Sequence, residues 1–102
     1  MPELTVVYWR DIPAQVIVGK GRKSARYQLP ERFEQAIDRC AMRIGAIGTD
    51  AYLAEWRKSA PRAVNGDPQE VAAREAARIE AEFDMGRIRE LIRNDGWENA
   101  AE

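Results

Sequence analysis

The groups in this sequence that could take part in chemistry are mainly charged and aromatic side chains. The chain has no histidine, which removes the commonest general base, the usual activator of a serine or cysteine nucleophile and a favoured zinc ligand. Its single cysteine, Cys40, falls on the apolar side of an expected helix with Ile37 and Ile44. Burial there would raise the pKa of the thiol rather than lower it. We therefore predict no catalytic residue, no cofactor and no metal ligand, and expect a protein that is not an enzyme.

The carboxylates form no recognisable catalytic or metal-binding pattern. Asp11 follows Arg10 at an expected turn, and Asp38 lies on the expected central helix. The densest acidic group alternates with other residues over 80–84, and alternation sends neighbouring side chains to different sides of a helix. These carboxylates are more typical of a solvated helix face than of a metal site or an acid–base pair.

A glycine-rich basic segment, GKGRKSAR at residues 19–26, is the most distinctive loop. Glycines let backbone N–H groups approach an anion closely, and basic side chains add charge-assisted hydrogen bonds to a phosphate. The order GxxxxGK[ST] of a Walker loop is absent. The segment is a candidate site for a phosphate, a nucleic-acid backbone or an acidic protein surface, through Lys20, Arg22, Lys23 and Arg26. The alternative is an exposed loop whose charges protect a strand edge from aggregation.

Aromatic residues beside arginines supply a second candidate surface. Trp9 precedes Arg10 and Asp11, and Trp56 precedes Arg57. Tryptophan and arginine are enriched at the energetic centres of protein interfaces. A core tryptophan whose charged neighbour extends to solvent gives the same pattern. We treat Trp9, Arg10 and Asp11 as candidates for partner binding, and the core alternative stays open for Trp9.

Strands are expected to carry both candidate surfaces. Residues 4–10 and 14–19 are rich in β-branched and aromatic side chains, which predicts two strands. The short connection at residues 11–13 favours an antiparallel hairpin with Pro13 in the turn. A third short strand is expected at residues 25–29.

A central helix follows the strands. Residues 29–48 place apolar side chains at three- and four-residue steps, which is one face of an amphipathic helix. Gly45 and Gly48 should end the helix. We expect the apolar ridge from Phe33 to Ile47 to be buried beneath the strands, which gives an α+β fold.

Two further helices are expected in the second half of the chain. A short helix should begin at residue 49 or 50 and end near Ser59, because the residue before Pro61 is disfavoured in helical geometry. Residues 60–67 have the composition of a loop. A longer helix should then start at Pro68, after Asp67 as its cap, and end at residues 94–96.

The apolar stripe of that longer helix changes side at Gly86. Either the helix bends or breaks there, or its last part covers another surface. A homodimer through Met85, Ile88 and Ile92 would be one such arrangement.

The length of 102 residues and the hydrophobic content of 45% suit one core. We predict one domain over residues 1–95 and a frayed tail over residues 96–102. Residues 1–62 carry eleven basic and seven acidic side chains, whereas residues 63–102 carry five and ten. This asymmetry either steers a partner toward one face or reflects complementarity inside the fold. No signal peptide or membrane span is visible, and the single cysteine fits a reducing compartment. A cytoplasmic location is expected.

Three segments resemble the bacterial virulence factor domain family: YWRDIPAQV at residues 8–16, LPERF at residues 29–33 and AID at residues 36–38. The resemblance implies a small bacterial protein named for a phenotype rather than a reaction. Some longer relatives join the domain to helical repeats, which this chain lacks. It also implies an accessory role beside corrinoid- and folate-dependent methyl-transfer proteins. It carries no catalytic residue over to this chain.

The leading hypothesis is therefore a non-enzymatic cytoplasmic accessory or adaptor protein. It would bind a protein partner through Trp9, Arg10, Asp11 and the basic loop. The alternative is a small module that binds nucleic acid or a phosphorylated ligand with the GKGRKSAR segment. An enzyme ranks third.

Overall fold

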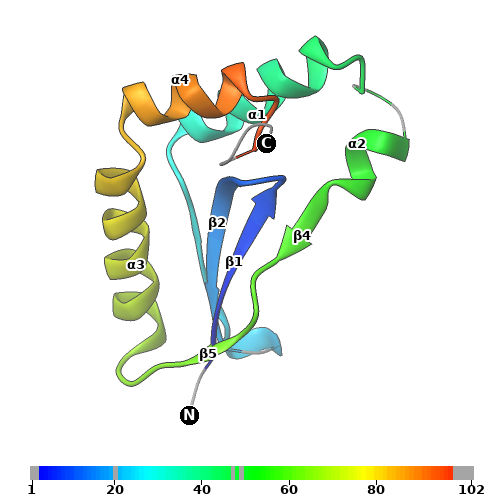
Figure 1. Cartoon of the computed structure of the whole chain (residues 1–102). Helices are drawn as coiled ribbons and strands as arrows, with labels where there is room; N and C mark the ends of the chain where they lie inside the picture. The colour runs from blue at the N-terminus through cyan, green and yellow to red at the C-terminus, as the bar shows by residue number, and fades with distance from the viewer. Residues whose placement is uncertain (1–2, 20, 47, 49, 98–102) are drawn as a thin grey trace.

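The computed structural model describes residues 3–19, 21–46, 48 and 50–97, and only the backbone of Lys23 (Figure 1). Lys20 and Ile47, which enter the predictions above, lie outside the described residues. In chain order the elements are β1 (Glu3–Trp9), β2 (Ile12–Val18), the 3-10 turn η1 (Gly21–Lys23), β3 (Ala25–Gln28), α1 (Glu31–Arg43), α2 (Asp50–Ala54), β4 (Trp56–Lys58), β5 (Arg62–Ala63), α3 (Pro68–Glu82) and α4 (Met85–Arg93).

The strands form one antiparallel sheet in the order β3-β2-β1-β4, and β5 also pairs with β1. The predicted hairpin and third strand are confirmed, and the fold is α+β. Trp9 pairs with Ile12, so the hairpin turn consists of Arg10 and Asp11. The prediction that Pro13 lies in the turn is wrong, because Pro13 lies in β2 opposite Tyr8. The register shifts beside it, and such a bulge accommodates a proline in a paired strand.

The short helix expected up to Ser59 is wrong over its second half. The helix α2 ends at Ala54, and β4 follows as a strand paired with β1. The backbone nitrogen of Ser59 donates to the carbonyl oxygen of Val6 at 2.9 Å, and the nitrogen of Val6 donates to the Ser59 hydroxyl oxygen at 2.9 Å. Buried backbone groups require such partners, so the free edge of β1 draws this segment out of helical geometry.

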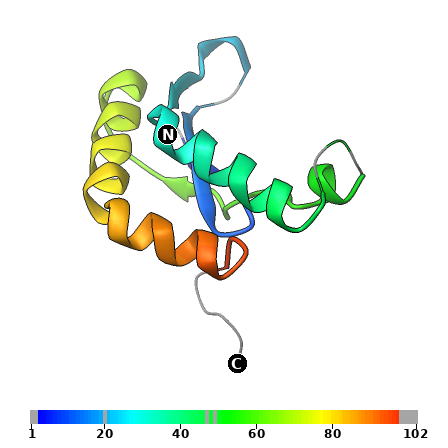
Figure 2. The ribbon, with the colours of Figure 1, turned by 90° about the horizontal axis from the view of Figure 1, so that it is seen from above.

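The central helix α1 buries the predicted ridge. Its buried residues are Phe33, Ala36, Ile37, Cys40 and Ala41, and it packs on β2 and α4. Gly45 has a φ of 72°, which is a left-handed conformation that glycine adopts without a steric penalty. As predicted, this glycine marks the end of the helix. Figure 2 shows α1 and α4 lying side by side across one end of the sheet.

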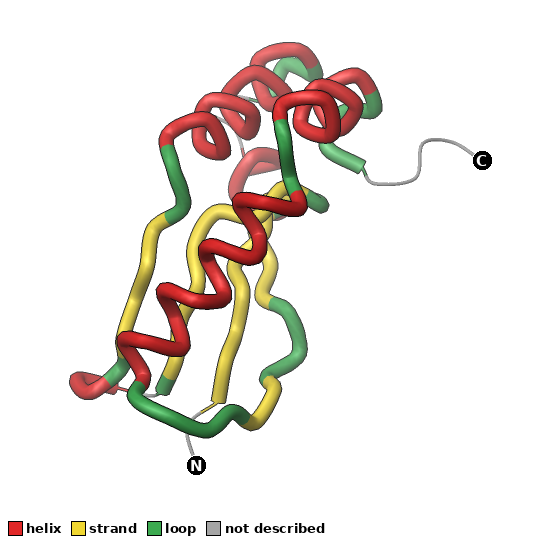
Figure 3. Tube along the Cα trace, turned by 90° about the vertical axis from the view of Figure 1, so that its left-hand side faces the viewer, coloured by secondary structure: helices red, strands yellow, loops and turns green. Residues whose placement is uncertain are grey.

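The long C-terminal helix is two helices. Asp67 caps α3 by accepting from the nitrogen of Glu70 at 3.1 Å, and Pro68 opens the helix as predicted. Asp84 caps α4 in the same way, accepting from the nitrogen of Arg87 at 2.9 Å. The break therefore precedes Gly86. Before the break, α3 packs along β2 and β3, and after it α4 packs on α1 (Figure 3). Within the described residues, no helix is both long and apolar enough to cross a bilayer.

Candidate functional site

Arg10, in the hairpin turn, contacts residues from several segments of the chain. Its side chain, only 14% exposed, forms an ion pair with Glu55 at 3.1 Å and donates to the carbonyl oxygen of Asp95 at 2.7 Å. The guanidinium also lies over the rings of Trp9 and Trp97, at 5.2 Å and 5.1 Å from their centroids. Arg10 itself has a φ of 56°, a strained value for a residue with a side chain. Arg10 therefore joins the hairpin to both the β4 region and the C-terminal segment.

Asp11 completes these connections. Its backbone nitrogen donates to the carbonyl oxygen of Gly96 at 2.8 Å, and its carboxylate pairs with Arg57 at 2.8 Å. Arg57 also donates to the carbonyl oxygen of Arg10 and lies over the ring of Tyr8. Gly96 and Trp97, which we predicted in the frayed tail, thus contact the hairpin turn, and residues 98–102 lie outside the described part.

Trp9 occupies the core, one of the two positions that the sequence left open. This side chain is completely buried, and its Nε1 donates to the carbonyl oxygen of Tyr52 at 2.9 Å. It cannot touch a partner while the domain is folded. Of the Trp-Arg-Asp group, only Asp11 and the edge of Arg10 reach solvent, and both are occupied by internal contacts.

Two arginines of the basic segment are exposed. Arg22 in η1 and Arg26 in β3 are exposed and form no ion pair with a described residue. Tyr27, beside Arg26, is 41% exposed. Lys20 and the side chain of Lys23 fall outside the description. The structure therefore places two of the four predicted basic side chains at the surface, and one of them, Arg26, lines a shallow hollow together with Tyr27.

A groove between α1 and α4 is lined by three arginines that sequence reasoning did not single out. Its volume is about 270 Å³, and its lining residues are Arg32, Gln35, Ala36, Arg39, Met85, Ile88, Arg89 and Ile92. Arg39 and Arg89 are exposed and form no ion pair with any described residue. Met85 is 50% exposed, whereas Ile88 is buried in the core at 2%. Of the stripe considered for a homodimer, Met85 is thus the exposed member, Ile92 is half-buried, and Ile88 belongs to the chain's own interior.

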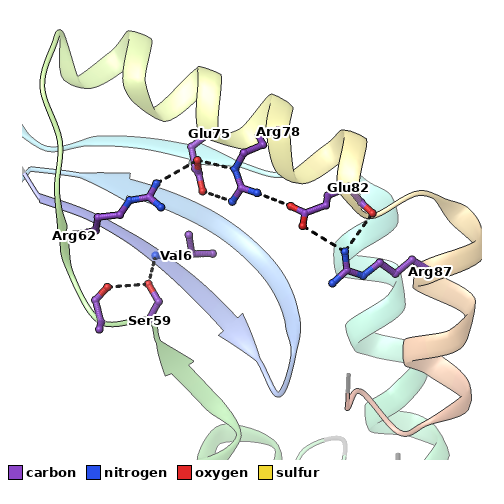
Figure 4. Close-up of polar contacts among 8 residues, drawn as sticks. Val6, Ser59, Arg62, Glu75, Arg78, Glu82 and Arg87 are labelled. Carbon is purple, nitrogen blue, oxygen red and sulfur yellow. Dashed lines mark hydrogen bonds and ion pairs between the residues drawn. The ribbon is translucent and has the colours of Figure 1, made fainter. Parts of the chain in front are cut away.

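A chain of alternating charges runs along α3 (Figure 4). Arg78 holds the carboxylate of Glu75 through two hydrogen bonds, of 3.1 Å and 2.6 Å, and also pairs with Glu82. Arg62 of β5 reaches the same Glu75 at 3.4 Å, and Arg87 of α4 reaches Glu82 at 3.7 Å. Glu75 is 8% exposed. The network therefore ties β5, α3 and α4 together around one buried carboxylate.

Comparison with known protein families places the chain. A family model described as "Virulence factor" matches residues 7–92. The chain belongs to the virulence factor family. Neither a curated protein nor a solved structure matches it. The family model covers the hairpin turn, the basic loop, the α1–α4 groove and the Glu75 network, and it confirms the resemblance seen in residues 8–16 and 29–38.

The two titratable groups of this virulence factor domain that burial perturbs most clearly are not poised for reaction. Burial raises the pKa of the Cys40 thiol to about 11, so the nucleophilic thiolate is scarce at neutral pH. Burial likewise raises the pKa of the Tyr8 hydroxyl. Among the described residues, no three metal-binding side chains lie together.

One signal for the Glu75 network was present in the sequence of the virulence factor domain. Glu75, Arg78 and Glu82 are spaced by three and four residues, which places them on one helix face. Such spacing is common on solvated helices, and nothing in it shows that Arg62 arrives from a strand. The α1–α4 groove could not be recognised for a related reason, since its two walls are separated by about half of the chain.

Proposed function

We propose that this virulence factor domain is a non-enzymatic cytoplasmic accessory protein that binds an acidic, partly apolar segment of another protein in its α1–α4 groove. The observation that supports it most directly is the pair Arg39 and Arg89. They line the groove beside exposed Met85 and have no ion-pair partner among the described residues. Such a surface combines uncompensated positive charge with an apolar floor.

Charge and shape both favour an acidic helix as the occupant. The groove lining includes three arginines and no carboxylate, so a partner with acidic side chains would be attracted and correctly oriented. The apolar floor runs along α4, whose nine residues span about 14 Å at 1.5 Å per residue. An amphipathic helix of two to three turns matches that length and is a common ligand for grooves between helices.

The resemblance suggests which partners to test first. It implies an accessory role beside corrinoid- and folate-dependent methyl-transfer proteins, so an acidic surface helix of such a protein is the first candidate. The cytoplasmic location rests on the sequence, whose single cysteine suits a reducing compartment.

A binding experiment with matched variants tests the proposal. Fluorescence anisotropy would measure the affinity of a labelled amphipathic peptide with glutamates on one face and leucines on the other. We expect the double variant Arg39→Ala, Arg89→Ala to weaken binding at least tenfold, and salt to weaken binding to the wild type. Arg93→Ala is the control, because it also removes an exposed α4 arginine but one that pairs with Glu90 at 2.8 Å outside the groove.

The same variants then decide whether a cellular partner uses the groove. A methyl-transfer protein that copurifies with the wild type should be lost from the double variant and retained by Arg93→Ala. Equal recovery by all three proteins would reject the groove. Sedimentation velocity would reveal the other outcome, a homodimer through Met85 and Ile92.

The basic loop supports a second candidate function, binding of nucleic acid or a phosphorylated ligand. Arg22 and Arg26 are exposed without an ion-pair partner among the described residues, and Tyr27 offers a ring on which a base could stack. Arg22→Ala with Arg26→Ala should then abolish binding of single-stranded RNA and its salt dependence. Arg39→Ala should leave that binding unchanged.

A further inference from the structure

A cleft of about 470 Å³ lies beside the Glu75 network. It shares no lining residue with the α1–α4 groove. One wall comes from α3, and the other from β5, the two residues that follow it and Leu4 of β1. Its lining residues are Leu4, Arg62, Ala63, Val64, Asn65, Val71, Arg74, Glu75 and Arg78. This volume lies in the range of small-molecule binding sites.

The charged side chains around the cleft are net positive. Within the lining, Arg62 and Arg78 share one carboxylate, Glu75, and the nearby Glu82 is itself shared by Arg78 and Arg87. Arg74, the next basic residue of the lining, is exposed and pairs with no described residue. The site therefore has a net positive charge that attracts an anionic group.

Glu75 fixes the arginines in place rather than filling the cleft. Its carboxylate is occupied by two hydrogen bonds from Arg78 and by the ion pair with Arg62. These contacts lower the pKa of Glu75, chiefly through the Arg78 hydrogen bond, so the carboxylate is charged at neutral pH. Arg78 is further engaged by Glu82, which leaves Arg74 and the remaining N–H groups of Arg62 as donors for a ligand.

We propose that this cleft binds a small organic acid, with the carboxylate on Arg74 and Arg62 and the apolar body against Leu4, Val64 and Val71. A guanidinium binds a carboxylate in a planar, two-pronged geometry. The three apolar side chains supply a surface for aliphatic carbon, which a purely ionic site would lack.

Calorimetric titration of the full chain tests the assignment with butanoate, hexanoate, 1-hexanol and inorganic phosphate. Each buried methylene contributes about 0.8 kcal/mol, or about fourfold in affinity. Hexanoate should therefore bind roughly fifteenfold more tightly than butanoate, whereas 1-hexanol and phosphate should bind at least tenfold more weakly than hexanoate.

Two variants connect that affinity to the cleft. Arg74→Ala should weaken hexanoate binding at least tenfold, and its circular dichroism should stay that of the wild type because the side chain is exposed. Arg93→Ala, which removes an exposed arginine that lines neither the cleft nor the α1–α4 groove, should bind hexanoate as the wild type does. Backbone amide shifts in NMR spectra should change at Val64 and Val71.

Several results would overturn the assignment: no saturable hexanoate binding, equal affinity for 1-hexanol, phosphate binding as tight as hexanoate, or an unchanged affinity in Arg74→Ala. The outcome is separate from that of the α1–α4 groove, since the acidic-peptide experiment depends on Arg39 and Arg89 and not on Arg74.

Discussion

The indole Nε1 of Trp9 donates a hydrogen bond to the backbone carbonyl oxygen of Tyr52 at 2.9 Å. The two rings also lie 5.9 Å apart, so α2 is fastened to the end of β1. Trp9→Phe should lower the free energy of unfolding by about 2–4 kcal/mol, because it leaves a carbonyl unpaired and a void in the core. Urea denaturation followed by circular dichroism measures this. Trp97→Phe, at a ring that is 41% exposed, should cost less than about 1 kcal/mol.

Replacing Arg10 should be among the most damaging changes at the protein surface. Arg10→Ala removes the Glu55 ion pair and the hydrogen bond to Asp95, and leaves a partly buried carboxylate unpaired. We expect a loss of about 2–4 kcal/mol in unfolding free energy. Arg57→Ala, whose side chain is 48% exposed, should cost at most about 1 kcal/mol. A loss of unfolding free energy in Arg10→Ala that is no larger than the loss in Arg57→Ala would contradict the central role of Arg10 in the turn.

Acid should weaken the fold through Glu75. The Arg78 hydrogen bonds hold the pKa of Glu75 below its ordinary value of 4.5 in the folded chain. A depressed folded pKa contributes stability that is complete above the unfolded value and disappears as pH falls through the folded one. Glu75→Gln lacks this contribution. The difference in urea midpoint between wild type and Glu75→Gln should therefore be constant from pH 7 to about 5.5 and shrink below about 4.5; a pH-independent difference would contradict the ion-pair account.

Cys40 should resist thiol reagents until the protein unfolds. Its side chain is fully buried and burial raises its pKa to about 11. Labelling with a thiol reagent at pH 8 should be at least about a thousandfold slower in native buffer than in 6 M urea, since only opened molecules react. The Trp9→Phe variant should label faster than the wild type. Rapid labelling of the native wild type would mean that α1 opens locally.

Gly86→Ala should stabilise the protein by about 0.5–1 kcal/mol, because alanine favours a helix more than glycine does. A Cβ at this position would meet only the Oδ1 atom of Asp84, at an ordinary 3.4 Å. Asp84→Ala should instead cost about 1 kcal/mol by removing the cap of α4. The melting temperatures of the two variants test both predictions. A lower melting temperature for Gly86→Ala would mean that the break between α3 and α4 requires the glycine.

Local sequence patterns were sufficient to predict the hairpin, α1 and the start of α3. In each case the decisive residues are neighbours in sequence: the apolar steps from Phe33 to Ala41, or Asp67 followed by Pro68. The Gly86 region was read as one interrupted helix, because the apolar stripe shows that the direction changes but not that Asp84 starts a new helix.

Contacts between distant residues explain what the patterns missed. Residues 56–58 have an acceptable helical pattern, yet Trp56 pairs with Trp9 because the open edge of β1 needs a partner. Trp9 and Arg10 have the residue types of an interface centre, and only the folded chain shows that Tyr52, Glu55 and Asp95 occupy them. Arg39 and Arg89 have no local feature that distinguishes them from other helix arginines, and the groove appears only once α1 and α4 lie together.

The bonds from Arg10 to Asp95 and from Asp11 to Gly96 also constrain how the protein is made. Residues 10 and 11 leave the ribosome early, but the atoms that complete their hydrogen bonds are translated about 85 residues later. During synthesis the hairpin can pair while its tip still lacks these acceptors. A nascent chain stalled before residue 95 should therefore be cleaved more readily by protease than one released after residue 97.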